Sequence, residues 1–333
     1  MNDLEFRLVN DYQRDFPLCA EPFAEIARRV GASADAVMEA YARLAAGGAL
    51  SRIGAVFGAN RVGASTLAAM RVPAARLEEV AQRVSSRAEV NHNYEREHEW
   101  NLWFVATAPD AARLAAALAA IERDCGLPVM RLPLEEDFHI DLGFDLRDGS
   151  VPARGARRGG ERVELERGER ALLAALQSGL PIVARPYREL AARAGVPESE
   201  VAATIGRWLA QGVVKRFGVV VRHHELGYGA NAMVVWDVPD REVARIGERL
   251  AQSEGVTLCY RRPRVPPHWD YNLFCMIHGT DRAYVLQQVD ALRSRWELTG
   301  YRHEVLFSRR RFKQRGARYA ESAAGLPDFV VGS

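Results

Sequence analysis

Two related halves follow one another in this sequence, and this duplication limits the folds that the chain can adopt. Residues 16–31 (FPLCAEPFAEIARRVG) resemble residues 180–195 (LPIVARPYRELAARAG). Residues 100–106 (WNLWFVA) resemble residues 271–277 (YNLFCMI), after a short insertion at 262–269 in the second half. A repeat of this kind indicates one structural unit that was duplicated and then diverged.

Each half begins with a pattern typical of a helix-turn-helix. Apolar residues recur at helical spacing through residues 16–50, and Ser33 stands where the N-cap of the second helix is expected. Residues 181–214 repeat this pattern, with Gly195 in the turn. Two short helices joined by a turn that contains glycine indicate a helix-turn-helix or a winged helix.

Each half then continues with strand-like and helix-like runs in the order βαββαβ. This order is typical of the ferredoxin-like unit, an antiparallel sheet with helices on one face. The predicted strands of the first half are 66–72, 88–94, 100–107 and 129–141, with helices at 74–86 and 110–123. Those of the second half are 229–238, 255–261, 271–278 and 300–308, with helices at 240–253 and 281–295.

The predicted fold class is therefore α+β, a tandem duplication of a winged or helix-turn-helix domain followed by a ferredoxin-like βαββαβ domain. This arrangement resembles the Lrp/AsnC family of transcription regulators. The expected parts are helix-turn-helix domains at 1–52 and 166–216, ferredoxin-like domains at 53–145 and 217–315, a linker at 146–165 and a C-terminal tail at 316–333.

Charge and cysteine content exclude several classes of protein. The 333 residues carry 45 Lys and Arg against 43 Asp and Glu, so the chain as a whole is not a polycationic nucleic-acid binder. The 4 cysteines lack the spacing of a zinc site, so we expect no protein-bound metal. No apolar run reaches the roughly 20 residues of a membrane span. The acidic start lacks a signal-peptide pattern, so we expect a cytoplasmic protein that does not bind membranes.

The predicted recognition helices are poorly suited to DNA. Residues 33–48 place Arg43 beside Asp35 and Glu39, and residues 197–212 place Arg207 beside two glutamates. Because affinity for DNA depends largely on phosphate contacts, acidic helices weaken it. We therefore expect no specific DNA binding and a packing role for these helices.

Polar and aromatic residues are densest in two equivalent segments, 92–104 and 259–274. Hairpin loops normally favour Gly, Asn and Asp, whereas these segments hold Tyr, Trp, His and Arg. A flat aromatic ligand with carboxylates would pack on such rings and pair with the arginines. The alternative is a solvated hairpin whose rings belong to the core.

The histidines differ between the halves, which is compatible with structural drift or with two specialised halves. His223 and His224 align with Ala59 and Asn60, whereas His98 aligns with Trp269. Histidine titrates near neutral pH and is the natural proton donor. Because neighbouring residues on a strand face opposite sides, the sequence leaves open whether His223 or His224 points inward.

Several separate motifs resemble the siroheme decarboxylases, Lrp/AsnC-like proteins that work as two related subunits or as one fused chain. These motifs are HNYER with the following WNLWF, RHHELGYGANAMVVW, YNLF with MIHG, and LFSRRRFKQRGARY. The resemblance covers both halves and implies removal of CO2 from two acetate side chains of siroheme. The product would be didecarboxysiroheme, on the way to haem d1 or, in other organisms, haem.

This reaction gives the polar residues a chemical purpose. Protonation of the ring creates an electron sink, the acetate loses CO2, the remaining methylene group is protonated to a methyl group, and the ring releases its added proton. A histidine would supply the proton, while arginines hold the other carboxylates in place. The candidate catalytic residues are His98, His223 and His224. The candidate substrate-binding residues are Arg222, His92, Tyr94, Arg96, Asn101, Tyr260, Arg261, Arg262, His268, Trp269 and Asn272.

The resemblance implies that no cofactor is required, since the iron enters as part of the siroheme substrate. The expected partner is siroheme, with other tetrapyrrole-pathway enzymes and further copies of the chain as open alternatives. Two other functions stay open: a DNA-binding regulator of the Lrp/AsnC type and a non-catalytic tetrapyrrole-binding protein. The sequence also leaves open whether a histidine ligates the iron, whether one cleft or two performs the decarboxylations, and in which order these occur.

Overall fold

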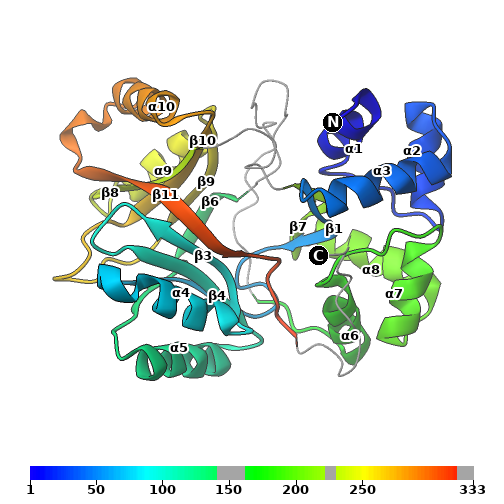
Figure 1. The fold of residues 1–333 in the computed structure, drawn as a ribbon, viewed down its shortest axis with the longest axis horizontal. Helices are drawn as coiled ribbons and strands as arrows, with labels where there is room; N and C mark the ends of the chain where they lie inside the picture. Colours follow the sequence, from blue (N-terminus) through cyan, green and yellow to red (C-terminus); the bar gives the residue numbers. More distant parts are fainter. Residues whose placement is uncertain (141–161, 222–229, 321–333) are drawn as a thin grey trace. The chain divides into compact units, whose positions relative to one another are not determined.

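A computed structural model describes residues 1–140, 162–221 and 230–320 (Figure 1). The chain divides into two compact units, and each takes segments from both halves. The helical unit comprises Met1–Val62, Gly160–Leu226 and Gly316–Ser333, and the sheet unit comprises Gly63–Gly159 and Gly227–Arg315. Each unit combines several of the six domains and segments expected from the sequence. The division into two units therefore does not test where each of those segments begins and ends. Most of the predicted linker lies outside the described residues.

The helical unit contains the two predicted helix-turn-helix motifs, which are confirmed. Its first half contains α1 (Asp3–Asp11), α2 (Pro22–Val30), α3 (Ala34–Ala46) and β1 (Leu50–Phe57), and its second half contains α6 (Arg167–Leu176), α7 (Pro186–Ala194), α8 (Glu198–Ala210) and β7 (Val214–Val221). Gly31 and Gly195 end the first helix of each motif with φ of 73° and 64°, a left-handed conformation that favours glycine. Ser33 caps α3 by accepting a hydrogen bond from the Ala36 N–H.

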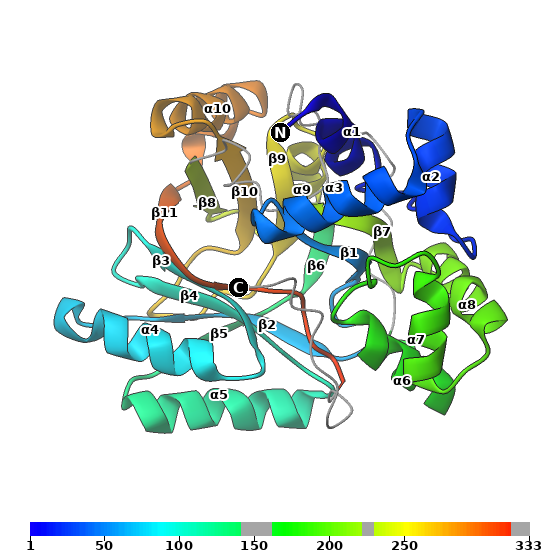
Figure 2. The ribbon, with the colours of Figure 1, turned by 45° about the vertical axis from the view of Figure 1, so that its right-hand side comes forward.

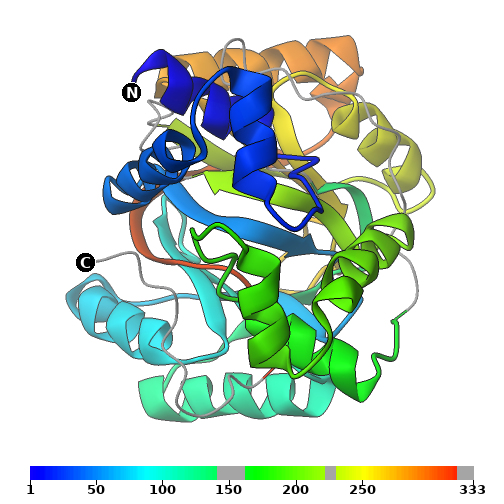
Figure 3. The ribbon, with the colours of Figure 1, turned by 90° about the vertical axis from the view of Figure 1, so that its right-hand side faces the viewer.

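Strands β1 and β7 join the two halves of the helical unit as a two-stranded antiparallel sheet (Figure 3). Gly54 and Gly218 lie opposite each other in this pair. A Cβ atom on Gly218 would overlap the carbonyl oxygens of Tyr12 and Gln13, so the close approach of the chain after α1 requires glycine here.

The sheet unit contains both ferredoxin-like repeats, and their helices and strands form in the predicted order. The first repeat contains β2 (Ala64–Met70), a 3-10 turn (Ala74–Arg76), α4 (Leu77–Ser86), β3 (Val90–Arg96), β4 (Leu102–Ala108), α5 (Ala111–Cys125), β5 (Met130–Pro133) and β6 (Glu136–Ile140). The second contains β8 (Ala230–Trp236), α9 (Val243–Ala251), β9 (Val256–Arg261), β10 (Leu273–Gly279), α10 (Arg282–Arg295), a 3-10 turn (Leu298–Gly300) and β11 (His303–Gln314). All nine strands form one sheet in the order β5-β2-β4-β3-β11-β8-β10-β9-β6.

The last strand of each repeat differs from the prediction. In both cases, part of the predicted strand pairs with a strand of the other repeat. The single strand predicted at 129–141 is wrong, because β5 pairs with β2 of the first repeat while β6 pairs with β9 of the second. Strands β5 and β6 lie at opposite ends of the strand order, yet only Leu134 and Glu135 separate them in the sequence. The ends of the sheet therefore meet, and the sheet curls round on itself.

The strand predicted to end at residue 308 continues to Gln314 as β11. Its residues from His303 to Phe307 pair with β8, and those from Ser308 to Gln314 pair with β3 (Figure 2). Prediction from one repeat at a time missed this, because half of the strand finds its partner in the other repeat.

The two faces of the curled sheet carry different cores. On the outer face, α4 and α5 pack against the first repeat through residues such as Val80, Leu118 and Phe104. Helices α9 and α10 cover the second repeat in the same way. We call the other face of the sheet, whose side chains point away from these four helices, the inner face. Its side chains join both repeats in one aromatic-rich cluster. This cluster contains Leu67, Ala69, Trp100, Trp103, Met130, Leu132, Met233, Val235, Tyr260, Trp269, Tyr271, Phe274, Met276 and Leu306.

Candidate active site

The inner face brings together many of the residues predicted to bind substrate. Because side chains alternate along a strand, His92, Tyr94 and Arg96 of β3 share this face, while Asn93 points to α4 and donates to the Ala81 carbonyl. In the second repeat, the same alternation places Tyr260 and Arg262 on the inner face. These five residues therefore come from equivalent places in the two repeats.

Each repeat contributes one tyrosine and one arginine in the same pattern. The guanidinium carbon of Arg96 lies 5.8 Å from the centre of the Tyr94 ring, and that of Arg262 lies 4.6 Å from the Tyr260 ring. Such distances allow a cation–π contact. Burial raises the pKa of both tyrosines, and the nearby guanidinium groups oppose this shift. The hydroxyl groups therefore stay neutral at physiological pH.

Each of the two arginines reaches into the opposite repeat. Arg96 donates to the carbonyl oxygen of Leu306 at 2.9 Å, and Arg262 donates to that of Leu132. Only 7% of Arg96 and 9% of Arg262 is exposed. The Nε atoms of both side chains are buried without a hydrogen-bond partner in the described part of the chain.

Neither arginine pairs with a carboxylate within residues 1–140, 162–221 and 230–320. Burial lowers the pKa of Arg96 to about 10 and also lowers that of Arg262. Both groups remain charged near neutral pH. A buried cation is costly unless an anion compensates it, so each guanidinium is a favourable place for a carboxylate.

His98 lies in the turn after β3 and connects the two repeats. Its Nδ1 accepts a hydrogen bond from the Trp100 N–H at 2.9 Å, and its Nε2 lies 2.9 Å from a carboxylate oxygen of Glu304. The hydroxyl group of Tyr271 donates to the other oxygen of Glu304 at 2.7 Å. The proton of neutral His98 is therefore on Nε2, the nitrogen that faces Glu304.

Aromatic rings surround His98. Its ring meets that of Trp269 edge to face at 5.6 Å, and Trp269 lies 5.1 Å from the Trp103 ring. Trp269 is buried, whereas His268 is exposed and lies 6.3 Å from the Trp100 ring. Earlier on β3, the ring of His92 stacks on that of Tyr94 with ring centres 6.3 Å apart.

Three residues predicted to bind substrate have other contacts in the structure. Asn101 exchanges two hydrogen bonds with the backbone of Val72, and Asn272 does the same with Val238. These equivalent asparagines hold the chain that follows β2 and β8. Arg261 lies on the opposite face from Tyr260 and forms an ion pair with Glu135 at 2.9 Å. The structure does not bring it to the inner face.

Arg222, His223 and His224 lie outside the described residues, so their roles stay predictions. His278 was not among the predicted site residues, although it is the third residue of the run MIHG on β10. It follows Met276 by two positions and therefore shares the inner face. Burial, with a smaller effect from the charge of Arg96, lowers the pKa of His278 to about 4. The alternation of side chains along the predicted strand 271–278, which puts His278 on the same face as Phe274 and Met276, was the signal that could have revealed it.

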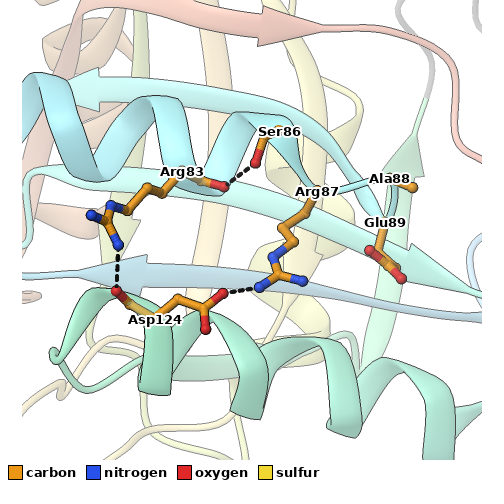
Figure 4. Close-up of a pocket in the computed structure, with 6 residues that line it drawn as sticks. All are labelled: Arg83, Ser86, Arg87, Ala88, Glu89 and Asp124. Atoms are coloured by element: carbon orange, nitrogen blue, oxygen red, sulfur yellow. Dashed lines mark hydrogen bonds and ion pairs between the residues drawn. The ribbon is translucent and has the colours of Figure 1, made fainter.

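A hollow on the outside of the sheet unit lies at the C-terminal ends of α4 and α5 (Figure 4). Its lining includes Arg83 and Arg87, but Asp124 accepts hydrogen bonds from both. The positive charge is thus partly compensated, and the hollow is separate from the inner face. The described residues contain neither a cluster of metal-ligating side chains nor a helix long and apolar enough to cross a membrane.

Comparison with known proteins agrees with this architecture. The family model for an AsnC-like ligand binding domain matches residues 61–139 and 225–313, and that for a siroheme decarboxylase NirDL-like HTH domain matches residues 5–50 and 169–214. The siroheme decarboxylase NirDL subunit of Paracoccus denitrificans is 46% identical over 324 residues, covering 97% of this chain and 99% of that protein.

Two further relatives show the duplication and the fold. The siroheme decarboxylase NirD subunit of Pseudomonas aeruginosa is 53% identical over 146 residues, which cover 44% of this chain and 97% of the subunit. The crystal structure of the siroheme decarboxylase NirDL in complex with an iron-uroporphyrin III analogue superposes with a TM-score of 0.68 at 26% identity, covering 96% of this chain and 95% of that chain. This chain therefore belongs to the siroheme decarboxylase family, in the form that joins two related halves in one polypeptide.

Proposed function

We propose that this protein decarboxylates siroheme, removing CO2 from two acetate side chains to give didecarboxysiroheme. The names of its full-length relatives support this activity, and a structural relative binds an iron-uroporphyrin III analogue. The observation that carries the proposal is the pair of buried arginines, Arg96 and Arg262, one from each repeat, with no carboxylate partner in the described part of the chain.

These two arginines suit a flat ligand with several carboxylates. A guanidinium group binds a carboxylate through two parallel charged hydrogen bonds, which also fix its orientation. Tyr94 and Tyr260 lie beside these arginines, and with Trp269 they would supply the aromatic contacts to a macrocycle. Because the arginines occupy equivalent positions, they would hold carboxylates on two sides of the macrocycle.

The reaction requires one proton for each CO2 that leaves. The bond between the acetate methylene carbon and its carboxylate breaks, CO2 departs, and a proton from an acid completes the methyl group. His98, His223 and His224 are the proposed acids. To act as an acid, His98 would be an imidazolium that releases the proton on Nε2, the nitrogen that faces Glu304. This form requires a proton on Nδ1 as well, so Nδ1 would give up the hydrogen bond that it accepts from the Trp100 N–H.

The remaining assignments are also proposals. The protein itself would need no cofactor, because the iron belongs to the substrate. We propose a cytoplasmic enzyme that binds neither DNA nor membranes, for which siroheme is the main partner.

Anaerobic incubation of the protein with siroheme tests the proposal. Mass spectrometry should show products that have lost one and then two CO2. Arg96→Met and Arg262→Met should reduce product formation, whereas Arg131→Gln, which alters an exposed arginine paired with Glu122, should not. Binding of siroheme without any release of CO2 would leave a non-catalytic tetrapyrrole-binding protein instead.

A further inference from the structure

Two equivalent side-chain pairs, each joining two neighbouring strands of the sheet, differ in their ability to carry a proton. In the first repeat, the Asn91 side-chain amide donates to the Thr107 hydroxyl oxygen at 3.0 Å. In the second repeat, the matching positions hold Thr257 and His278, and the Thr257 oxygen lies 3.0 Å from Nδ1 of His278. Only the second pair contains an imidazole, a side chain that can take up a proton.

The hydrogen bonds determine which nitrogen of His278 carries the proton. The Thr257 hydroxyl donates to the carbonyl oxygen of Met276 at 3.2 Å. Its oxygen is therefore the acceptor toward His278, and Nδ1 of His278 is the donor. Neutral His278 thus has its lone pair on Nε2, so this nitrogen would gain the next proton.

Arg96 is the charged neighbour that acts on His278. A terminal nitrogen of Arg96 lies 3.8 Å from the sulfur of Met276, the side chain next to His278 on the inner face of β10. Among the described neighbours, Tyr94 and Tyr260 near Arg96 and Thr257 near His278 are uncharged at neutral pH. The positive charge of Arg96 thus disfavours a second positive charge on His278.

We propose that a carboxylate of the bound substrate, by pairing with Arg96, causes His278 to take up a proton from solvent. This inference rests on the proposed function, because it requires a ligand that carries carboxylates. The carboxylate compensates the charge of Arg96 and brings a negative charge near His278, and both effects favour the imidazolium form. His278 is then charged only while substrate is in place, and this occurs on one side of the inner face because Thr107 occupies the equivalent position.

Calorimetry measures this proton directly. Binding of iron uroporphyrin III is titrated near neutral pH in two buffers of different ionisation enthalpy, and the difference gives the protons taken up. The unaltered protein should take up a proton fraction that both His278→Gln and Arg96→Met lose. His303→Gln is the matched control, because His303 stacks on Trp236 on the outer face and should leave proton uptake unchanged.

The pH dependence of binding provides a second measurement. Affinity for the porphyrin should fall as the pH rises above about 4, the pKa of His278 in the free protein. The slope reaches about tenfold per pH unit when one full proton is coupled to binding. His278→Gln should flatten this slope. Proton uptake that is equal in the unaltered protein and in His278→Gln would overturn the proposal, as would a Soret shift showing that His278 ligates the iron.

Should the variants fail to fold, nuclear magnetic resonance of the unaltered protein decides the question. With 15N-labelled histidine and metal-free uroporphyrin III, the signal that stays neutral down to about pH 4 without ligand should become that of an imidazolium in the complex. A signal that stays neutral would overturn the proposal. Failure to release CO2 from siroheme would overturn the proposed function alone, since proton uptake on binding is measured without turnover.

Discussion

Arg96 and Arg262 occupy equivalent places in the two repeats, yet their surroundings differ. Each is buried, lies near a tyrosine ring and donates to a carbonyl oxygen of the other repeat. Arg96 also contacts Met276 on β10, two residues before His278, whereas the residues on β4 that correspond to Met276 and His278 are Val105 and Thr107. The two repeats thus share the buried arginine, whereas the histidine at position 278 of the second repeat corresponds to a threonine, Thr107, in the first. An asymmetric substrate would meet two similar anchors with different chemistry beside them.

His98 gives the largest expected effect in this comparison, because its counterpart Trp269 cannot donate a proton from an imidazole. If His98 is the proposed acid, His98→Ala should lower the decarboxylation rate by about 10²–10⁴-fold while siroheme still binds. Single-turnover mass spectrometry of each CO2 loss measures this, and Soret titration checks the binding. Normal rates in His98→Ala would leave His223 and His224 as the proposed donors.

Replacing either arginine tests whether the two anchors are equally strong. Arg96→Met and Arg262→Met should each weaken binding of iron uroporphyrin III by about 1.5–3 kcal/mol, the usual contribution of a hydrogen bond to a charged group. Soret titrations provide the affinities, with Arg131→Gln as the control. Equal binding of a porphyrin without carboxylates would contradict the anchoring role.

Gly54 and Gly218, which lie opposite each other in the β1–β7 pair, also occupy equivalent places in the two halves but differ in their surroundings. Gly218→Ala should destabilise the protein by about 1–3 kcal/mol, because the new methyl group overlaps the backbone after α1. At Gly54 the nearest atom, Cα of Gly179, is 3.3 Å from an added Cβ, so Gly54→Ala should cost less. Thermal unfolding of both variants checks the order, and a reversed order would contradict it.

His278 should also make stability depend on pH in the absence of ligand. Its pKa is lowered from 6.5 to about 4 in the folded chain, so its contribution is fully present above about 6.5. That contribution is lost as the pH falls from about 6.5 toward 4, because the unfolded chain binds the proton more readily. Denaturant unfolding across this range should be less pH-dependent in His278→Gln. An unchanged profile would show that other groups cause the dependence.

The smallest expected effect concerns DNA. At about 0.15 M salt, we expect no sequence-specific binding to the promoter region of the protein's own gene, since acidic residues accompany the arginines of both recognition helices. In the structure, Glu5 and Glu169 form ion pairs with Arg43 and Arg207. A nanomolar, sequence-dependent gel shift would favour the regulator instead.

Local sequence patterns predicted the helix-turn-helix motifs and the βαββαβ order, because helical spacing and strand alternation depend on near neighbours. They also identified Tyr94, Arg96, Tyr260 and Arg262 as candidates. They did not predict that β6 and half of β11 pair with the opposite repeat, because such pairing depends on contacts distant in sequence. The face of each side chain depended on the register as well, which is why Arg261 was included and His278 was not.

The crossing strands have a consequence for how the molecule can be made. If the chain were cut between β6 and α6, the first fragment would keep the strand that pairs with β9, and the second would keep the strand that pairs with β3. Each fragment alone would expose unpaired strand edges, which promote aggregation. Two separately expressed halves should therefore be soluble only when they are produced together, each completing the sheet of the other.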